Sequence, residues 1–201
     1  SWNGSAWSEV ADISSNRTNA GTAGTYTAGL LFGGSVAPVT AVNESWNGSA
    51  WTEVGDLNTA RTRSLGQSVG TQTAAMMIGG EGVTVTEQWN GSAWTEVNDL
   101  NSPREIGGGN GIVTSAIAVS GRLVSPNAVS ALVEAYDGTS WTEVNDVSTG
   151  RVYTSATGTG SGNNNQQSLF YGGATSGSTA NTTATEEFAA ADFVTKTFTS
   201  S

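Results

Sequence analysis

Apolar residues along this chain occur in short runs bounded by Gly, Asn, Ser or Thr, and no window has the period of an amphipathic helix. Between residues 58 and 100 the pattern predicts four strands in succession. They span Arg63–Gly70, Thr73–Gly79, Val83–Trp89 and Ala93–Leu100, with turn residues between them. We therefore expect an all-β chain built from antiparallel hairpins.

The same succession of strands and turns recurs along the whole chain. A pair of aromatic residues marks each copy, at a period of roughly 45 residues, which is typical of the four-stranded blades of a β-propeller. The pairs are Trp2/Trp7, Trp46/Trp51, Trp89/Trp94, Tyr136/Trp141 and Phe188/Phe193. We expect residues 1–201 to form one propeller domain or its C-terminal part, with an orphan outer hairpin at 1–13 and repeats at 14–57, 58–100, 101–147 and 148–201.

Charged residues and glycines recur at equivalent places in these copies. A glutamate precedes the first aromatic residue of a pair by two positions, at Glu44, Glu87, Glu134 and Glu186, and an arginine opens each repeat, at Arg17, Arg61, Arg104 and Arg151. A Gly-Gly doublet ends an apolar strand at Gly33–Gly34, Gly79–Gly80 and Gly172–Gly173, whereas the third copy has Ser120–Gly121. We interpret the arginines as structural, bonding backbone carbonyls or a glutamate of the same or the next blade. A line of binding groups is the alternative.

The hexapeptide WNGSAW predicts a tight hairpin turn, because Asn and Gly tolerate positive φ. A two-residue loop would make the two indoles diagonal neighbours, and a four-residue loop would place them directly opposite. In both cases we expect an aromatic patch that packs against the next blade. The alternative is an exposed platform for sugar rings, formed by Trp2, Trp7, Trp46, Trp51, Trp89, Trp94, Tyr136 and Trp141.

Composition excludes several classes of function. The net charge of −10, with Lys196 as the single lysine, argues against nucleic-acid binding, and no apolar run is long enough for membrane insertion. Without His or Cys the chain has no usual zinc site and no Cys or Ser–His nucleophile. The acidic residues recur in every copy, whereas an active site is normally singular. We therefore expect no enzymatic activity, no metal and no cofactor.

These motifs resemble the kelch family of β-propellers. The family's pattern is a double glycine, an aromatic residue, a Trp and an Arg, which correspond here to Gly79–Gly80, Trp89, Trp94 and Arg104. The chain is closer still to the kelch-like arrays of marine bacteriophages and bacteria. Ser120, the polar insert at 160–168 and the last aromatic pair depart from the pattern.

The resemblance implies a structural or adhesive component of a phage virion, similar to a tail fibre, at the virion surface or outside the cell. Its partners would be other virion or surface chains, further copies of itself or host glycans. One alternative is a lectin-like propeller with one shallow carbohydrate site per blade, and another is a protein-interaction scaffold of the eukaryotic kelch type. Because the first hairpin lacks inner strands, we expect the C-terminal part of a longer chain, with a compact four- or five-bladed ring as the alternative.

Overall fold

The chain is all-β, as expected. The computed structural model describes residues 1, 4–35, 37–66, 69–158, 167–176, 180–189 and 196–198. These residues contain no α-helix, and hence no helix that could cross a membrane. Their strands form four four-stranded antiparallel sheets and one small three-stranded sheet.

Each four-stranded sheet takes its strands in chain order. The first sheet comprises β1 (Gly21–Thr25), β2 (Ala28–Phe32), β3 (Asn43–Trp46) and β4 (Trp51–Val54). The second comprises β5 (Gly70–Thr71), β6 (Ala74–Ile78), β7 (Thr86–Trp89) and β8 (Trp94–Val97). The third comprises β10 (Gly108–Ile112), β11 (Ser115–Val119), β14 (Val133–Tyr136) and β15 (Trp141–Val144).

The remaining strands complete the fold. The fourth sheet comprises β16 (Ser155–Gly158), β17 (Gln167–Tyr171), β18 (Thr185–Ala189) and β19 (Lys196–Phe198). The three-stranded sheet has the order β13 (Ala128–Val129), β12 (Arg122–Leu123) and β9 (Arg104–Glu105).

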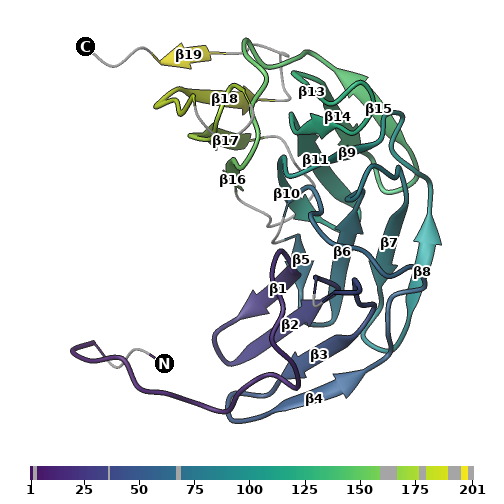
Figure 1. Ribbon diagram of the computed structural model, residues 1–201, viewed down its shortest axis with the longest axis vertical. Helices are drawn as coiled ribbons and strands as arrows, with labels where there is room; N and C mark the ends of the chain where they lie inside the picture. The colour runs from purple at the N-terminus through teal and green to yellow at the C-terminus, as the bar shows by residue number, and fades with distance from the viewer. Residues whose placement is uncertain are drawn as a thin grey trace.

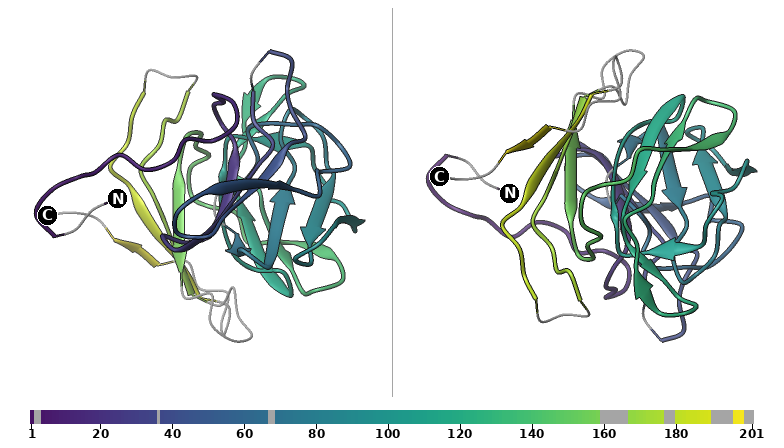
Figure 2. Two further views of the ribbon diagram at one scale, coloured as in Figure 1. Left: turned by 90° about the horizontal axis from the view of Figure 1, so that it is seen from below. Right: turned by 90° about the horizontal axis from the view of Figure 1, so that it is seen from above.

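The four large sheets stand side by side along an open arc, as Figure 1 shows. Their first strands, β1, β5, β10 and β16, lie on the inner side of the arc, and β4, β8 and β15 lie on its rim. The two views in Figure 2 show the sheet of β16–β18 at one end of the arc, beside the third sheet. This arrangement is consistent with a propeller-like fold, and the described residues do not close it into a ring.

The strands of the second repeat occur in the predicted order, but the first of them does not begin at Arg63 as predicted. Of the expected strand at Arg63–Gly70, residues 67 and 68 lie outside the described residues, β5 is Gly70–Thr71, and Leu65 forms only an isolated bridge to Ile78. The reason is that Arg63 has a φ of +59° and donates its N–H to the carbonyl of Asn19, which precedes the first sheet. An inter-sheet bond thus replaces the ladder bond that a longer strand would make.

The hairpins that carry the aromatic pairs have four-residue loops. Trp46 lies directly opposite Trp51 in the strand register, Trp89 opposite Trp94 and Tyr136 opposite Trp141. Figure 1 shows these hairpins, β3–β4, β7–β8 and β14–β15, toward the rim. The facing rings have centroid separations of 5.3, 5.7 and 5.0 Å, within the range of favourable aromatic pairs.

In the first of these turns the Asn and the Gly have different structural roles. The Oδ1 atom of Asn47 accepts hydrogen bonds from the backbone N–H groups of Ser49 and Ala50, both at 2.9 Å. Gly48 takes the left-handed conformation, with a φ of +95°. Asn47 therefore acts as an Asx turn residue, and only the glycine needs positive φ.

The hydrophobic core lies between successive sheets rather than within a single layer. In β2, Leu30 and Phe32 face the second sheet, and the Phe32 ring lies 4.8 Å from that of Trp94. In β6, Met77 packs in that same cluster, while Met76 and Ile78 pack toward the third sheet. A strand covered on both faces has no polar side, which explains the continuous apolar run of β6.

The second residue of the first three Gly–Gly or Ser–Gly doublets, a glycine in each case, links two neighbouring repeats. The N–H groups of these glycines donate to the carbonyl of the arginine that opens the next repeat, at 2.9–3.0 Å: Gly34 to Arg61, Gly80 to Arg104 and Gly121 to Arg151. All of these glycines have φ near +100°. A Cβ atom built on Gly80 would lie 2.4 Å from the carbonyl oxygen of Thr62. The doublets therefore serve close approach between neighbouring sheets.

The N-terminal segment, predicted as an orphan outer hairpin, stands apart from the four sheets in Figure 1. Ser8 donates its backbone N–H to the carbonyl of Ser1 at 2.7 Å, and Trp7 is 80% exposed. Trp2 and Phe193, together with most of the insert at 160–168, lie outside the described residues.

Candidate functional site

Each repeated arginine forms a buried ion pair with the repeated glutamate of its own repeat. The Nη2 atom of Arg104 lies 2.7 Å from Oε1 of Glu134, and the corresponding distance between Arg151 and Glu186 is 2.5 Å. The same pairing joins Arg17 to Glu44 and Arg61 to Glu87. The sequence left open whether the partner belongs to the same or the next blade, and in all four cases it belongs to the same repeat of the sequence.

The second oxygen of each glutamate is also occupied. In every repeat, Oε2 accepts the backbone N–H of the residue three positions before the arginine, at 2.7–2.9 Å; the donors are Ser14, Asn58, Asn101 and Ser148. Burial lowers the pKa of Arg104, and the charge of Glu134 opposes that shift. These charges are thus satisfied inside each repeat, and they do not converge on a common site.

Most of the repeated aromatic residues are buried between sheets. The buried ones are Trp46, Trp89, Trp94, Tyr136 and Trp141, while Trp51 is half-buried. The Trp46 and Trp89 indoles also donate Nε1–H to the carbonyls of Tyr26 and Gln72, at 3.0 and 2.9 Å. A buried indole presents no face to a sugar ring, so the alternative of an exposed platform does not apply to these five side chains.

Three backbone hydrogen bonds follow one another along the inner side of the arc, and we call this series the inner backbone chain. Arg63 donates its N–H to the carbonyl of Asn19, Ile106 to that of Arg63 and Tyr153 to that of Ile106, at 2.8–3.1 Å. Each of these residues lies two positions after a repeated arginine, and each has a φ between +51° and +59°. This conformation is costly for residues with a Cβ atom, and the inter-sheet bonds hold it in place.

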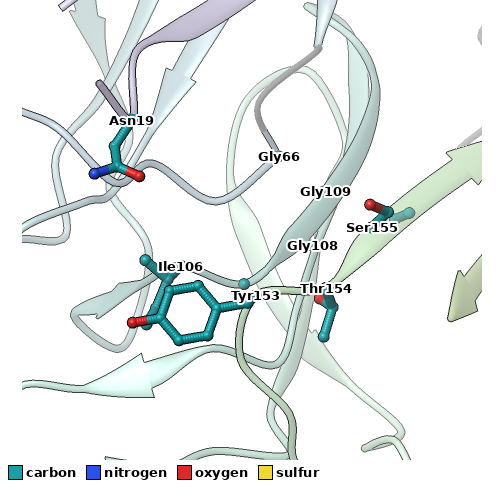
Figure 3. A pocket seen from close by; sticks show the side chains of 10 residues that line it. Asn19, Gly66, Ile106, Gly108, Gly109, Tyr153, Thr154 and Ser155 are labelled. Carbon is teal, nitrogen blue, oxygen red and sulfur yellow. The ribbon is translucent and has the colours of Figure 1, made fainter. Parts of the chain in front are cut away.

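A pocket of about 350 Å³ opens beside the inner backbone chain, as Figure 3 shows. The segments that lead into the first strand of all four sheets contribute to its wall. Its lining consists of Asn19, Gly66, Ile106, Gly107, Gly108, Gly109, Tyr153, Thr154, Ser155 and Ala156.

The pocket wall is neutral, and its polar groups are amide, hydroxyl and backbone. The ring of Tyr153 is 60% exposed. Thr154 Oγ1 is buried and has no hydrogen-bond partner among the described residues. Gly108 leaves space beside it, because a Cβ atom at that position would lie 3.2 Å from this oxygen. The buried Thr154 hydroxyl is not exposed to the pocket, so the groups that the pocket offers to a polar, uncharged ligand are the Tyr153 ring and the amide, hydroxyl and backbone groups of the other lining residues.

A charged cluster lies beside this region, at the small three-stranded sheet of the third repeat. The buried carboxylate of Glu105 pairs with Arg122, and the Arg63 guanidinium lies 3.7 Å from its Oε1 atom. Glu105 and Arg122 are also register partners in the small sheet of β9 and β12. The pair thus fastens that small sheet and has no counterpart in the other described repeats.

Sequence reasoning missed the pocket residues. The positions two after each arginine hold Asn19, Arg63, Ile106 and Tyr153, which share no chemical property that a pattern could reveal. The run GGGNG at 107–111 was the available signal, because consecutive glycines mark close backbone approach. In the structure a Cβ atom on Gly109 would lie 2.8 Å from the Cα atom of Gly66 in the neighbouring sheet.

Comparison with known proteins defines the fold and leaves the family open. The solved structure described as "Structure of YjhT" is similar to this chain with a TM-score of 0.74 and a sequence identity of 13%. The match covers 94% of this chain and 70% of that one. No family model matches the sequence, and no curated protein matches it. At this identity the likeness shows a shared fold alone.

Proposed function

We propose that this chain is a non-enzymatic structural and adhesive module, a set of kelch-like propeller blades carried by a phage virion or another extracellular appendage. The observation that carries the proposal is the use of the repeated charged and aromatic side chains inside and between the sheets. Their ion pairs and aromatic pairs stabilise a rigid scaffold. None of the four repeated Arg–Glu pairs lines the pocket.

The propeller interpretation is supported by three features. Four sheets repeat one strand order, their first strands lie together on the inner side of the arc in Figure 1, and backbone bonds link each sheet to the next at equivalent positions. Propeller blades meet around a central axis in this manner. Such a scaffold would present its loops and the pocket on a fixed surface, which supports an adhesive role.

The test is adhesion of the purified, fluorescently labelled chain to a panel of bacterial surfaces. We expect saturable binding to some of these cells, with untreated and periodate-oxidised cells compared to separate protein contacts from glycan contacts. Absence of binding to every surface, with a folded chain verified by circular dichroism, would contradict the adhesive role. Catalytic turnover of a glycan by the same preparation would contradict the non-enzymatic one.

A second candidate function is carbohydrate binding at the pocket. The observation in its favour is the neutral wall, where the exposed Tyr153 ring stands among amide, hydroxyl and backbone groups. A sugar face would stack on the ring, and the amide of Asn19 and the hydroxyl of Ser155 would bond its hydroxyls. This pocket is lined by segments that lead into all four sheets, so it predicts one site per chain, in place of the one site per blade expected from the sequence.

Glycan-array screening followed by titration calorimetry tests this candidate. We expect one binding site per chain, with affinity reduced at least tenfold in Tyr153→Ala. Tyr26→Ala is the matched control, because Tyr26 is a more exposed aromatic residue that does not line the pocket. Several equivalent sites per chain, or equal losses in the control, would exclude the pocket as the binding site.

A further inference from the structure

The two ends of the arc carry unused halves of the bonds that join neighbouring sheets. In the inner backbone chain, the N–H of Asn19 and the carbonyl of Tyr153 have no partner among the described residues. The links made by the glycine doublets end in the same way, since the N–H of Gly173 and the carbonyl of Arg17 have no described partner. One end therefore lacks an acceptor where the other lacks a donor.

The fourth sheet has one face that points away from the third sheet, which we call its downstream face. This face is exposed, although the equivalent faces of the other three sheets are buried in the core. Leu169 and Tyr171 of β17 are 41% and 39% exposed. They occupy the positions three and one before the Gly–Gly or Ser–Gly doublet. The residues at these positions in the other sheets are fully buried against the next sheet: Leu30/Phe32, Met76/Ile78 and Ile117/Val119.

The first sheet has one face that points away from the second sheet, which we call its upstream face. Its side chains are less buried than their counterparts in the second and third sheets. Trp51 is half-buried, whereas its counterparts Trp94 and Trp141 are buried by the sheet that precedes them. Leu31 is half-buried as well, whereas its counterpart Met77 is fully buried. Both end faces are thus halves of the same kind of interface, which occurs three times inside the molecule.

We propose that these two faces join copies of this chain head to tail. Leu169 and Tyr171 of one copy pack against Leu31 and Trp51 of a second copy, as Phe32 packs against Trp94 within the chain. The carbonyl of Tyr153 then accepts the N–H of Asn19 of the second copy, in continuation of the inner backbone chain. The internal repeat provides the argument for this occupant, because a second copy carries the complement of each face in the correct register.

The contact joins two different surfaces, so it is heterologous and leads to a closed ring or to an open filament. The inference rests on the equivalence of the sheets and not on the proposed function. Adhesion could fail while self-association holds, and the reverse is also true.

Native mass spectrometry and light scattering over a concentration series test the interface. We expect species at integer multiples of the 20.4 kDa chain mass. Two variants each remove one face: Leu31→Glu on the upstream face, and the double variant Leu169→Glu/Tyr171→Ser on the downstream face. Each variant alone should be monomeric, and Trp51→Ser replaces Leu31→Glu if circular dichroism shows that the latter does not fold.

Mixing the two variants makes the test specific for the head-to-tail arrangement. Each variant retains one intact face, so the mixture should form a heterodimer and no larger species. Val124→Glu is the matched control, because Val124 is 48% exposed and lies on neither end face, and it should associate as the unaltered chain does. A monomeric unaltered chain at every concentration, a mixture that stays monomeric, or a variant of one face that still self-associates would overturn the proposal.

Discussion

The second and third sheets follow one plan, and three of the equivalent places at which they differ are informative. Both contain the buried ion pair, the aromatic pair and the glycine link to the next sheet. The differences replace Gly79, Trp89 and Asn90 of the second sheet by Ser120, Tyr136 and Asp137 of the third. In each case the backbone geometry is retained, which shows that the fold requires a conformation and satisfied polar groups rather than particular residues.

Ser120 is the clearest case. It has a φ of +59°, where its counterpart Gly79 has +55°. Its hydroxyl accepts the N–H of Arg151 at 2.6 Å and lies 2.6 Å from the carbonyl oxygen of Ser130. Hydrogen bonds that glycine cannot make thus offset the cost of a left-handed residue with a Cβ atom.

The two arginines differ in the number of their carbonyl contacts. Arg61 donates to the carbonyls of Gly79, Met77 and Thr59 in addition to its glutamate. Arg104 donates to two carbonyls and its glutamate, and its Nε atom has no partner among the described residues. The third sheet therefore depends more strongly on its carboxylate.

The largest expected effect comes from removing that carboxylate. Glu87→Ala and Glu134→Ala should each lower the free energy of unfolding by about 3–5 kcal/mol, because an unpaired guanidinium remains buried. The loss should be greater for Glu134→Ala, since Arg104 has fewer other partners. Urea denaturation measures both.

Matched controls for this prediction lie directly across the strands. Glu96 faces Glu87 and Glu143 faces Glu134 in the register, and both are exposed. Their alanine variants should change the free energy of unfolding by less than about 0.5 kcal/mol. A larger loss for Glu87→Ala than for Glu134→Ala would refute the ranking of the two sheets.

The next largest effect concerns position 79, where a serine would introduce into the second sheet the hydroxyl hydrogen bonds that Ser120 makes in the third. Gly79→Ala should destabilise the chain by about 1–2 kcal/mol, through its positive φ and a Cβ atom 2.9 Å from the carbonyl oxygen of Arg104. Gly79→Ser should destabilise the chain by about 1 kcal/mol less than Gly79→Ala, because the serine hydroxyl can donate to that carbonyl as Ser120 does to its own. Thermal unfolding compares the two variants. An equal loss of stability would show that the serine hydrogen bonds depend on the surroundings of Ser120 in the third sheet.

A smaller effect is expected at the aromatic positions. Trp89→Phe removes a 2.9 Å bond to the Gln72 carbonyl, and Tyr136→Phe removes a 3.3 Å contact with the Gln88 amide. We expect a loss of at least about 1 kcal/mol for Trp89→Phe, which removes this hydrogen bond and part of a buried ring. For Tyr136→Phe, which removes only the hydroxyl, we expect a loss below about 1 kcal/mol. Urea midpoints measure both losses, and the reverse order would contradict this ranking.

The smallest effect is a pH dependence of the turns. Backbone hydrogen bonds from Ser140 and Thr139 lower the pKa of Asp137 below its usual value. The stability that this carboxylate contributes is therefore present above the usual Asp range and is lost as the pH falls through the lower pKa of the folded state. Asp137→Asn should abolish this part of the pH dependence, and Asn90→Asp should introduce it. Melting temperatures at about pH 7 and about pH 3 measure the change, with Asn90→Ala as the control.

Local patterns were sufficient for the all-β class, the repeat and the order of strands. Strand alternation, turn residues and recurrence are properties of neighbouring residues, so they are visible before any contact forms. The hairpin of Trp46 and Trp51 was expected on these grounds, although its four-residue loop was one of two possibilities. The structure decided between them through the hydrogen bonds of Asn47.

What the sequence determined by itself is a sheet that repeats, and what only the tertiary structure decided is how the sheets meet. The left-handed conformation of Ile106 and Tyr153 follows from hydrogen bonds between residues more than forty positions apart. The choice of Glu134 as the partner of Arg104, and the pocket beside Thr154, arise in the same way. No local signal encodes these features, because each depends on the position of a neighbouring sheet or strand that only the folded chain supplies.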